Sequence, residues 1–336
     1  MLIGLRGLEL EAADMAVLQH PATGGVVLFT RNYAGRDQLK ALTAAIREVG
    51  GRELLITVDH EGGRVQRFRD SFTRLPPLAT LGRIYSDHPD RALDLAYRHA
   101  RVMATELLLC GVDLSFAPVL DLGGKSEVIG DRAFSESAAV VQALGAHYLA
   151  GMHDAGMKTC GKHFPGHGSV AADSHVSDVT DGRALKDIEA QDLAPFRALG
   201  EHLDSVMMAH VVYPDAAPEP AGYSRFWIRD YLRARLGFRG LVFSDDLGMH
   251  AAGYAGKLPE RLDRSLEAGC DAVLVCEPDD VIDLYRALDD TGMAQADSPL
   301  AALRGGNTPS EAELAMVGEW AHWQRSMEEL VDSRWA

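Results

Sequence analysis

The chain has 336 residues, of which 47% are hydrophobic and 24% are charged, and its formal net charge is −16 at pH 7. This acidic balance argues against a nucleic-acid groove, which needs clustered lysine and arginine. No apolar run approaches the roughly 18 to 20 residues of a membrane span, and the N-terminal stretch turns acidic too soon for a signal peptide. We therefore expect a cytoplasmic protein with no nucleic-acid or membrane partner.

Short apolar runs recur along the whole chain. They are nearly continuous rather than alternating, which is typical of strands buried on both faces of a parallel sheet. These runs predict strands at residues 2–5, 26–30, 54–59, 112–121, 157–163, 205–210, 240–246 and 272–277. The 4 cysteines form no CxxC motif and most of them lie in apolar runs, so we expect reduced thiols in the core.

Longer segments with helical periodicity separate the predicted strands. The clearest helices are expected at residues 36–50, 90–111, 135–156, 186–202, 224–238 and 259–269. Strands that alternate with helices in this way indicate a (β/α)8 TIM barrel. We predict one catalytic barrel domain over residues 1–336, with a closing helical tail from about residue 308. A doubly wound open sheet is the alternative, but it would carry a Gly-rich phosphate loop after its first strand, and this sequence has none there.

Titratable residues gather at the ends of the predicted strands. Polar residues often stand where a buried strand stops, but here most of the strands end on a titratable group. The groups concerned are Asp59, Asp121, Lys162, His163, His210, Asp245, Asp246 and Glu277. Because TIM barrels place their chemistry at the carboxyl ends of the strands, these side chains predict one common site.

Two stretches early in the chain offer candidate substrate-binding groups. The stretch "VDHEGGRVQR" holds Asp59 and Arg67 around a Gly-Gly turn. A carboxylate can accept hydroxyl protons and a guanidinium can donate a fork of hydrogen bonds, so this pair can grip a polar substrate. A surface salt bridge explains the same two residues equally well. "GDRAF" places Arg132 in the loop after the fourth strand, and by itself this is a weak signal.

The fifth strand and the loop after it concentrate further polar groups. Lys162 and His163 end the strand, and a lysine there must have a partner or face a pocket. "FPGHG" then lets the chain leave the barrel and bend. In "ADSH", Asp173 precedes His175 by two positions, so in an extended segment both side chains point the same way. The carboxylate would favour the charged imidazole and make His175 a proton donor near neutral pH, although a solvated loop is the plainer explanation.

The seventh strand ends on two adjacent aspartates in "VFSDDLGM". One of them can serve as a carboxylate nucleophile, and the other can simply cap the next helix. Alternation of inward and outward side chains does not choose between Asp245 and Asp246, because both registers begin with apolar residues.

Taken in order and spacing, "VDHEGGRVQR", "GDRAF", "KHFPGHG", "DSH" and "FSDDL" resemble the signature of glycoside hydrolase family 3, in its bacterial β-N-acetylglucosaminidase branch. The resemblance runs from about Leu8 to Glu277 and implies a barrel without the second domain of larger relatives. It implies that terminal β-linked N-acetylglucosamine is removed from muropeptides, GlcNAc-anhydroMurNAc peptides of cell-wall recycling, with retention of configuration. "SDDLGM" departs slightly from the family, in which serine is commoner at the position of Gly248.

The resemblance also implies a role for particular side chains. Asp245 would be the nucleophile, and His175 the acid/base, paired with Asp173. Sugar contacts would come from Asp59, Arg67, Arg132, Lys162 and His163. We expect a monomer that binds a small carbohydrate substrate and carries neither a cofactor nor a metal.

Four other types of protein could use some of these residues. A zinc hydrolase could use His163, His167, His175 and His210, but a compact HxH or HExxH motif is missing. The acetamido group of the substrate could itself attack, as in other hexosaminidases. A phosphorylase is closer, because a histidine acid/base tolerates anionic phosphate better than a glutamate does. A non-catalytic sugar-binding module would leave the paired aspartates without a purpose.

Overall fold

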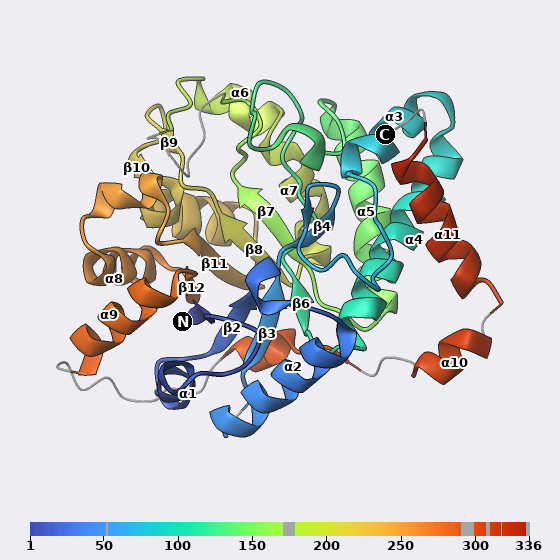
Figure 1. Ribbon diagram of the computed structural model, residues 1–336. Coiled ribbons are helices and arrows are strands. Elements are labelled where there is room, and N and C mark those ends of the chain that lie inside the picture. The colour runs from blue at the N-terminus through green and yellow to red at the C-terminus, as the bar shows by residue number, and fades with distance from the viewer. Residues whose placement is uncertain (52, 171–178, 290–298, 307–309, 317, 334–336) are drawn as a thin grey trace.

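The computed structural model describes the whole chain apart from residues 52, 171–178, 290–298, 307–309, 317 and 334–336. Its centre is a ring of parallel strands, each close to a strand predicted from the sequence (Figure 1). They are β1 (Leu2–Gly4), β2 (Gly25–Leu28), β3 (Leu55–Val58), β6 (Leu114–Ser115), β7 (Cys160–Phe164), β8 (Ser205–Met208), β11 (Leu241–Asp246) and β12 (Ala272–Val275).

The ring closes at two places. The first strand, β1, pairs with β12, placing Leu2 beside Leu274. Between β6 and β7 the ladder continues through a bridge from Val119 to Lys162, and the Leu120 N–H donates to the Lys162 carbonyl at 2.7 Å. The strands follow one another around the ring in chain order, so the predicted (β/α)8 barrel is confirmed.

Successive side chains on each strand alternate between the inside of the barrel and the surrounding helices. Leu2, Val27, Leu55 and Phe243 belong to the inner apolar cluster. Their neighbours in sequence, such as Ile3, pack in a larger cluster with the helices. The inner cluster also holds two buried thiols, and the four cysteines Cys110, Cys160, Cys270 and Cys276 are all buried and unbridged, as predicted.

Helices surround the ring, as Figure 1 shows. They are α1 (Ala12–Gln19), α2 (Arg36–Gly50), α3 (Leu78–Asp87), α4 (Pro89–Leu108), α5 (Ala138–Asp154), α6 (Leu185–Ala190), α7 (Leu193–Leu199), the π-helix η5 (Phe226–Arg235), α8 (Leu258–Ala268) and α9 (Pro278–Asp289). The helix predicted at 186–202 is in fact interrupted between α6 and α7. Gly51 ends α2 in the left-handed conformation, at φ 60°, which glycine adopts without a steric cost.

A short 3-10 helix, η7 (Pro299–Leu303), covers the amino-terminal end of the barrel. Leu300 and Leu303 are buried in the inner cluster. After this helix, Arg304 forms an ion pair at 2.5 Å with Glu53, which precedes β3. The Gly306 N–H donates a hydrogen bond of 2.8 Å to the carbonyl of Gly156, which precedes β7. This end of the barrel is therefore filled with apolar side chains.

The tail contains two helices, α10 (Glu311–Met316) and α11 (Trp320–Val331). Figure 1 shows α11, in red, lying along α4. Met327 of α11 is fully buried, and Gln324 donates to the Glu106 carboxylate of α4 at 3.0 Å. Among the described residues, no helix is both long enough and apolar enough to cross a membrane.

Two small antiparallel hairpins, which the sequence did not predict, follow strands of the barrel. The first, β4 (His60–Gly62) with β5 (Val65–Gln66), comes directly after β3. The second, β9 (Val212–Tyr213) with β10 (Ala217–Pro220), comes after β8. Both therefore belong to the carboxyl end of the barrel, where they shape the surroundings of the strand ends.

Candidate active site

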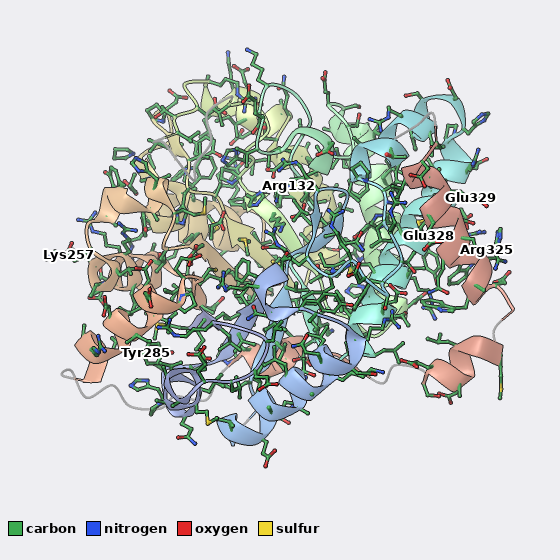
Figure 2. The ribbon with its side chains drawn as sticks, in the orientation of Figure 1. Arg132, Lys257, Tyr285, Arg325, Glu328 and Glu329 are labelled. Atoms are coloured by element: carbon green, nitrogen blue, oxygen red, sulfur yellow. The ribbon has the colours of Figure 1, made fainter. Side chains whose placement is uncertain are left out.

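A pocket of about 700 Å³ opens at the carboxyl ends of the barrel strands. The described residues among those predicted to be catalytic or to contact the sugar all contribute to its wall. They are Asp59, Arg67, Arg132, Lys162, His163 and Asp245. The remaining two, Asp173 and His175, lie outside the described residues. Figure 2 labels Arg132 near the middle of the molecule, beside the strands of the barrel.

A network of buried charges forms one wall of this pocket. Lys162, in the middle of β7, is almost fully buried, and its Nζ lies 2.6 Å from Asp59 Oδ1 and 2.6 Å from Glu61 Oε1. The Arg132 guanidinium donates two hydrogen bonds to the Glu61 carboxylate, from Nε to Oε2 at 2.8 Å and from Nη2 to Oε1 at 2.8 Å. Such bidentate pairs fix orientation as well as charge. The pocket therefore presents cations that are held in place by carboxylates.

Glu61 is the residue of this network that sequence reasoning missed. Only 2% of it is exposed, so it belongs to the interior despite its charge. Burial alone would raise the pKa of its carboxyl group, but the charges of Arg132 and Lys162 outweigh burial and hold the pKa below its ordinary value. The sequence could have indicated Glu61, because it stands two residues after Asp59 and side chains two apart in an extended segment point the same way.

The Asp59 carboxylate pairs with Lys162 rather than with Arg67. The Arg67 guanidinium instead lies 5.8 Å from the centre of the Phe29 ring, and its buried Nε has no hydrogen-bond partner among the described residues. The simple surface salt bridge between Asp59 and Arg67 is therefore absent from this part of the structure. Both side chains reach the pocket separately.

A buried aspartate orients His163. Asp121, fully buried, accepts a hydrogen bond from His163 Nδ1 at 2.6 Å and from the backbone N–H of His167 at 2.7 Å. Burial would raise the pKa of Asp121, but the two histidines and these hydrogen bonds bring it below its ordinary value. Since Nδ1 faces Asp121, Nε2 is the ring atom through which His163 can contact a ligand.

The two aspartates at the end of β11 have different surroundings. Asp246 Oδ1 accepts hydrogen bonds from the backbone N–H groups of Gly248 at 3.0 Å and Cys276 at 3.1 Å. Burial raises the pKa of Asp246 to about 6. Its own backbone N–H donates to Asp245 Oδ1 at 2.8 Å. Asp246 thus stabilises the turn after β11 and orients Asp245. The alternation of inward and outward side chains along the strand did not reveal this difference between the two residues.

His210, at the end of β8, is buried beside these aspartates. Its Nε2 lies 3.2 Å from the Asp246 carbonyl oxygen, so this nitrogen carries the proton. Burial lowers the pKa of His210, and the nearby charge of Asp245 opposes that effect only in part. The hydrogen bond to Asp246 fixes the orientation of this ring beside the end of β11. Among the described residues, no group of three or more His, Cys, Asp or Glu side chains is arranged to hold a metal ion.

Comparison with known proteins agrees with this geometry. The family model described as "Glycosyl hydrolase family 3 N terminal domain" matches residues 4–300. A β-hexosaminidase of Stenotrophomonas maltophilia (strain K279a) is 51% identical over 322 residues, 96% of this chain and 92% of that protein. A β-hexosaminidase of Xylella fastidiosa (strain M23) is 53% identical over 289 residues, 86% of each chain.

A solved structure extends the likeness to the fold. NagZ from Neisseria gonorrhoeae, in complex with N-trifluoroacetyl-D-glucosamine, superposes with a TM-score of 0.89 at 42% identity, covering 98% of this chain and 97% of that one. The resemblance of the sequence motifs is thereby confirmed. The chain belongs to glycosyl hydrolase family 3 and is a glycoside hydrolase of the β-N-acetylhexosaminidase class.

Proposed function

We propose that this enzyme removes terminal β-linked N-acetylglucosamine from muropeptides of cell-wall recycling, with retention of configuration. The proposed substrate is a GlcNAc-anhydroMurNAc peptide, and the enzyme acts as a cytoplasmic monomer in which residues 1–336 form one catalytic domain. The observation that carries the proposal is the pocket that Asp245 lines together with Lys162, Asp59 and Arg132. Lys162 and Arg132 are joined there by the buried Glu61. Retaining hydrolases place a nucleophile and an acid/base on either side of the scissile bond.

Asp245 is the proposed nucleophile. Its neighbour Asp246 is less suited to this role, because two backbone N–H groups hold its Oδ1 in the turn and its raised pKa disfavours the ionised form. In the first step an oxygen of Asp245 bonds to the anomeric carbon while the bond to the leaving oxygen breaks. Water then breaks the resulting ester and releases the sugar with its original configuration.

His175 is the proposed acid/base, with Asp173 as its partner. This assignment rests on the spacing of the sequence motif, because both residues lie outside the described part of the chain. A charged imidazole donates its proton to the leaving oxygen and becomes the neutral base that activates water in the second step. As a cation it also avoids the repulsion that a second carboxylate would meet beside Asp245.

The remaining predicted residues are proposed to bind the sugar. Asp59 is partly exposed to the pocket, so its carboxylate can accept hydroxyl hydrogen bonds while Lys162 stays paired with it. Arg132, His163 and Arg67 supply donors from the other sides. The N-acylated glucosamine present in the Neisseria NagZ complex supports a sugar of this kind.

The decisive experiment is to trap the covalent intermediate. A slow N-acetylglucosaminide should leave a sugar ester on Asp245 that peptide mass spectrometry detects, and Asp245→Asn should abolish both the ester and turnover. The matched control is Asp246→Asn, which should still form the ester. An ester elsewhere, or none while product still forms, would refute the nucleophile and favour attack by the acetamido group. If phosphate accelerates turnover and sugar 1-phosphate is released, the enzyme is a phosphorylase.

A further inference from the structure

The chain on either side of residues 171–178 is joined by one buried carboxylate, that of Asp192. Asp192 follows α6, and its side chain is fully buried. Ser169, just before the segment, donates its hydroxyl hydrogen to Asp192 Oδ1 at 3.2 Å. Arg183, just after the segment, places Nη1 2.7 Å from Asp192 Oδ2. A single side chain therefore connects the two flanks.

Further contacts make this junction rigid. Arg183 also grips Asp181 with Nε to Oδ1 at 3.0 Å and Nη2 to Oδ2 at 2.6 Å. Gly166 packs directly on Asp192, and a side-chain carbon there would come within 2.6 Å of the aspartate's Cβ. Because no residue but glycine fits, the chain leaving β7 must pass over Asp192 at close range.

The hairpin after β8 contacts the same two flanks. The Val212 N–H donates to the Val179 carbonyl at 2.9 Å, and the Asp181 N–H donates to the Val212 carbonyl at 2.8 Å. The neighbouring Tyr213 donates its hydroxyl hydrogen to the Gly166 carbonyl. The flanks are thus fixed relative to the barrel by β9 and relative to each other by Asp192.

We propose that Asp192 is a positioning residue for catalysis, which sets the spacing between Ser169 and Arg183 and through it the delivery of the proton by His175. The proposal rests on the function proposed above, in which His175 is the acid/base. Asp192 holds Ser169 and Arg183, and the stretch of sequence that contains His175 runs between these two residues. Because Asp192 is buried, losing its charged partner would leave an uncompensated polar group, so the spacing of the two flanks is tied to this pair.

The test compares substrates that need a proton with substrates that do not. Asp192→Asn keeps the size of the side chain and one acceptor but loses the ion pair with Arg183. We expect kcat/KM for a disaccharide, whose sugar leaving group must be protonated, to fall by about 10- to 100-fold, as a displaced acid predicts. For an aryl N-acetylglucosaminide with a good leaving group, we expect a loss in the first step of less than about 3-fold.

Asp113→Asn is the matched control. Asp113 is also buried and paired with an arginine, Arg47, at 2.9 Å, but it lies before β6 at the other end of the barrel. Asp113→Asn should lower thermal stability without changing the ratio of kcat/KM for the disaccharide to kcat/KM for the aryl substrate. Ser169→Ala, a milder change, should shift that ratio in the same direction and serves if Asp192→Asn does not fold.

Measuring His175→Ala alongside separates the two proposals. In one outcome, His175→Ala lowers kcat/KM for the disaccharide but not for the aryl substrate, whereas Asp192→Asn and Ser169→Ala change kcat/KM equally for both substrates or for neither. This outcome would refute the positioning role of Asp192 and leave the acid/base role of His175 intact. If His175→Ala itself does not discriminate between leaving groups, the acid/base assignment fails first, and the role of Asp192 fails with it.

Discussion

Glu61→Gln is the change that most directly tests the charged network of the pocket. Three charged contacts reach this carboxylate, from Arg132 at 2.8 Å twice and from Lys162 at 2.6 Å. Removing one member of a buried ion pair typically costs about 3–5 kcal/mol, and glutamine retains one acceptor oxygen, so we expect the lower end of that range. With an unfolding entropy of about 2.1 cal/mol/K per residue over 336 residues, a loss of about 3 kcal/mol lowers Tm by about 4 °C.

The same change should weaken sugar binding. Lys162 keeps Asp59 as a partner but loses the carboxylate that separates it from Arg132, so both cations shift. A displacement worth about 1.4 kcal/mol or more raises KM for an N-acetylglucosaminide at least about tenfold, measured by steady-state kinetics. Asp204→Asn is the control, because Asp204 pairs with Lys158 at 3.0 Å at the opposite end of the barrel. If Glu61→Gln lowers Tm but keeps wild-type KM and kcat, Glu61 does not order the binding site.

The remaining predictions concern the pKa of Asp246, the filled end of the barrel and the pocket arginine. Because its pKa is raised from about 4 to about 6, Asp246 favours folding when protonated, and that contribution is lost as pH rises through 6. Urea unfolding should show wild-type stability, relative to Asp246→Asn, falling by about 2 kcal/mol between pH 4 and 7, and a pH-independent difference would contradict the assignment. Leu303→Ala should cost about 2–5 kcal/mol in urea unfolding with KM unchanged, since the side chain fills the end away from the pocket, and a raised KM would show that the two ends are coupled. Arg67→Ala should raise KM about tenfold while shifting Tm by less than about 2 °C, because Nε has no partner in the described fold; a large Tm loss would identify a structural arginine.

The barrel could be predicted from the sequence because its signal is local. A strand buried on both faces is a continuous apolar run, and eight such runs with helices between them leave few alternatives. The hairpins β4–β5 and β9–β10 were missed because their strands are only two to four residues long and have no pattern of their own. The wide turns of η5 were also missed, and nothing in the propensities of residues 226–235 marks them.

The site was only partly predictable, because pairing depends on residues that are distant in sequence. Strand ends and motifs placed Asp59, Lys162 and Arg132 around one pocket. The strand ends and motifs did not show that Glu61 joins Lys162 to Arg132. Its burial becomes evident only when the folded barrel brings β7 and the loop with Arg132 beside it. Alternation left Asp245 and Asp246 open, and the proposal of Asp245 as nucleophile came from the family resemblance. The backbone hydrogen bonds that hold Asp246 depend on the turn after β11 and on β12, so the sequence could not show them.

The pairing of β1 with β12 has a consequence for how the chain acquires its structure. Leu2 and Leu274 lie side by side, so β1 gains its second partner strand only after the chain has been synthesised through β12. Until then β1 presents an unpaired edge, which is a template for association with other chains. Contacts between the two extremes of a sequence also slow folding, because a long loop must close first. A nascent or truncated chain that stops before Ala272 should therefore depend on chaperones and aggregate readily, whereas in the folded ring β1 is paired on both sides, with β2 and with β12.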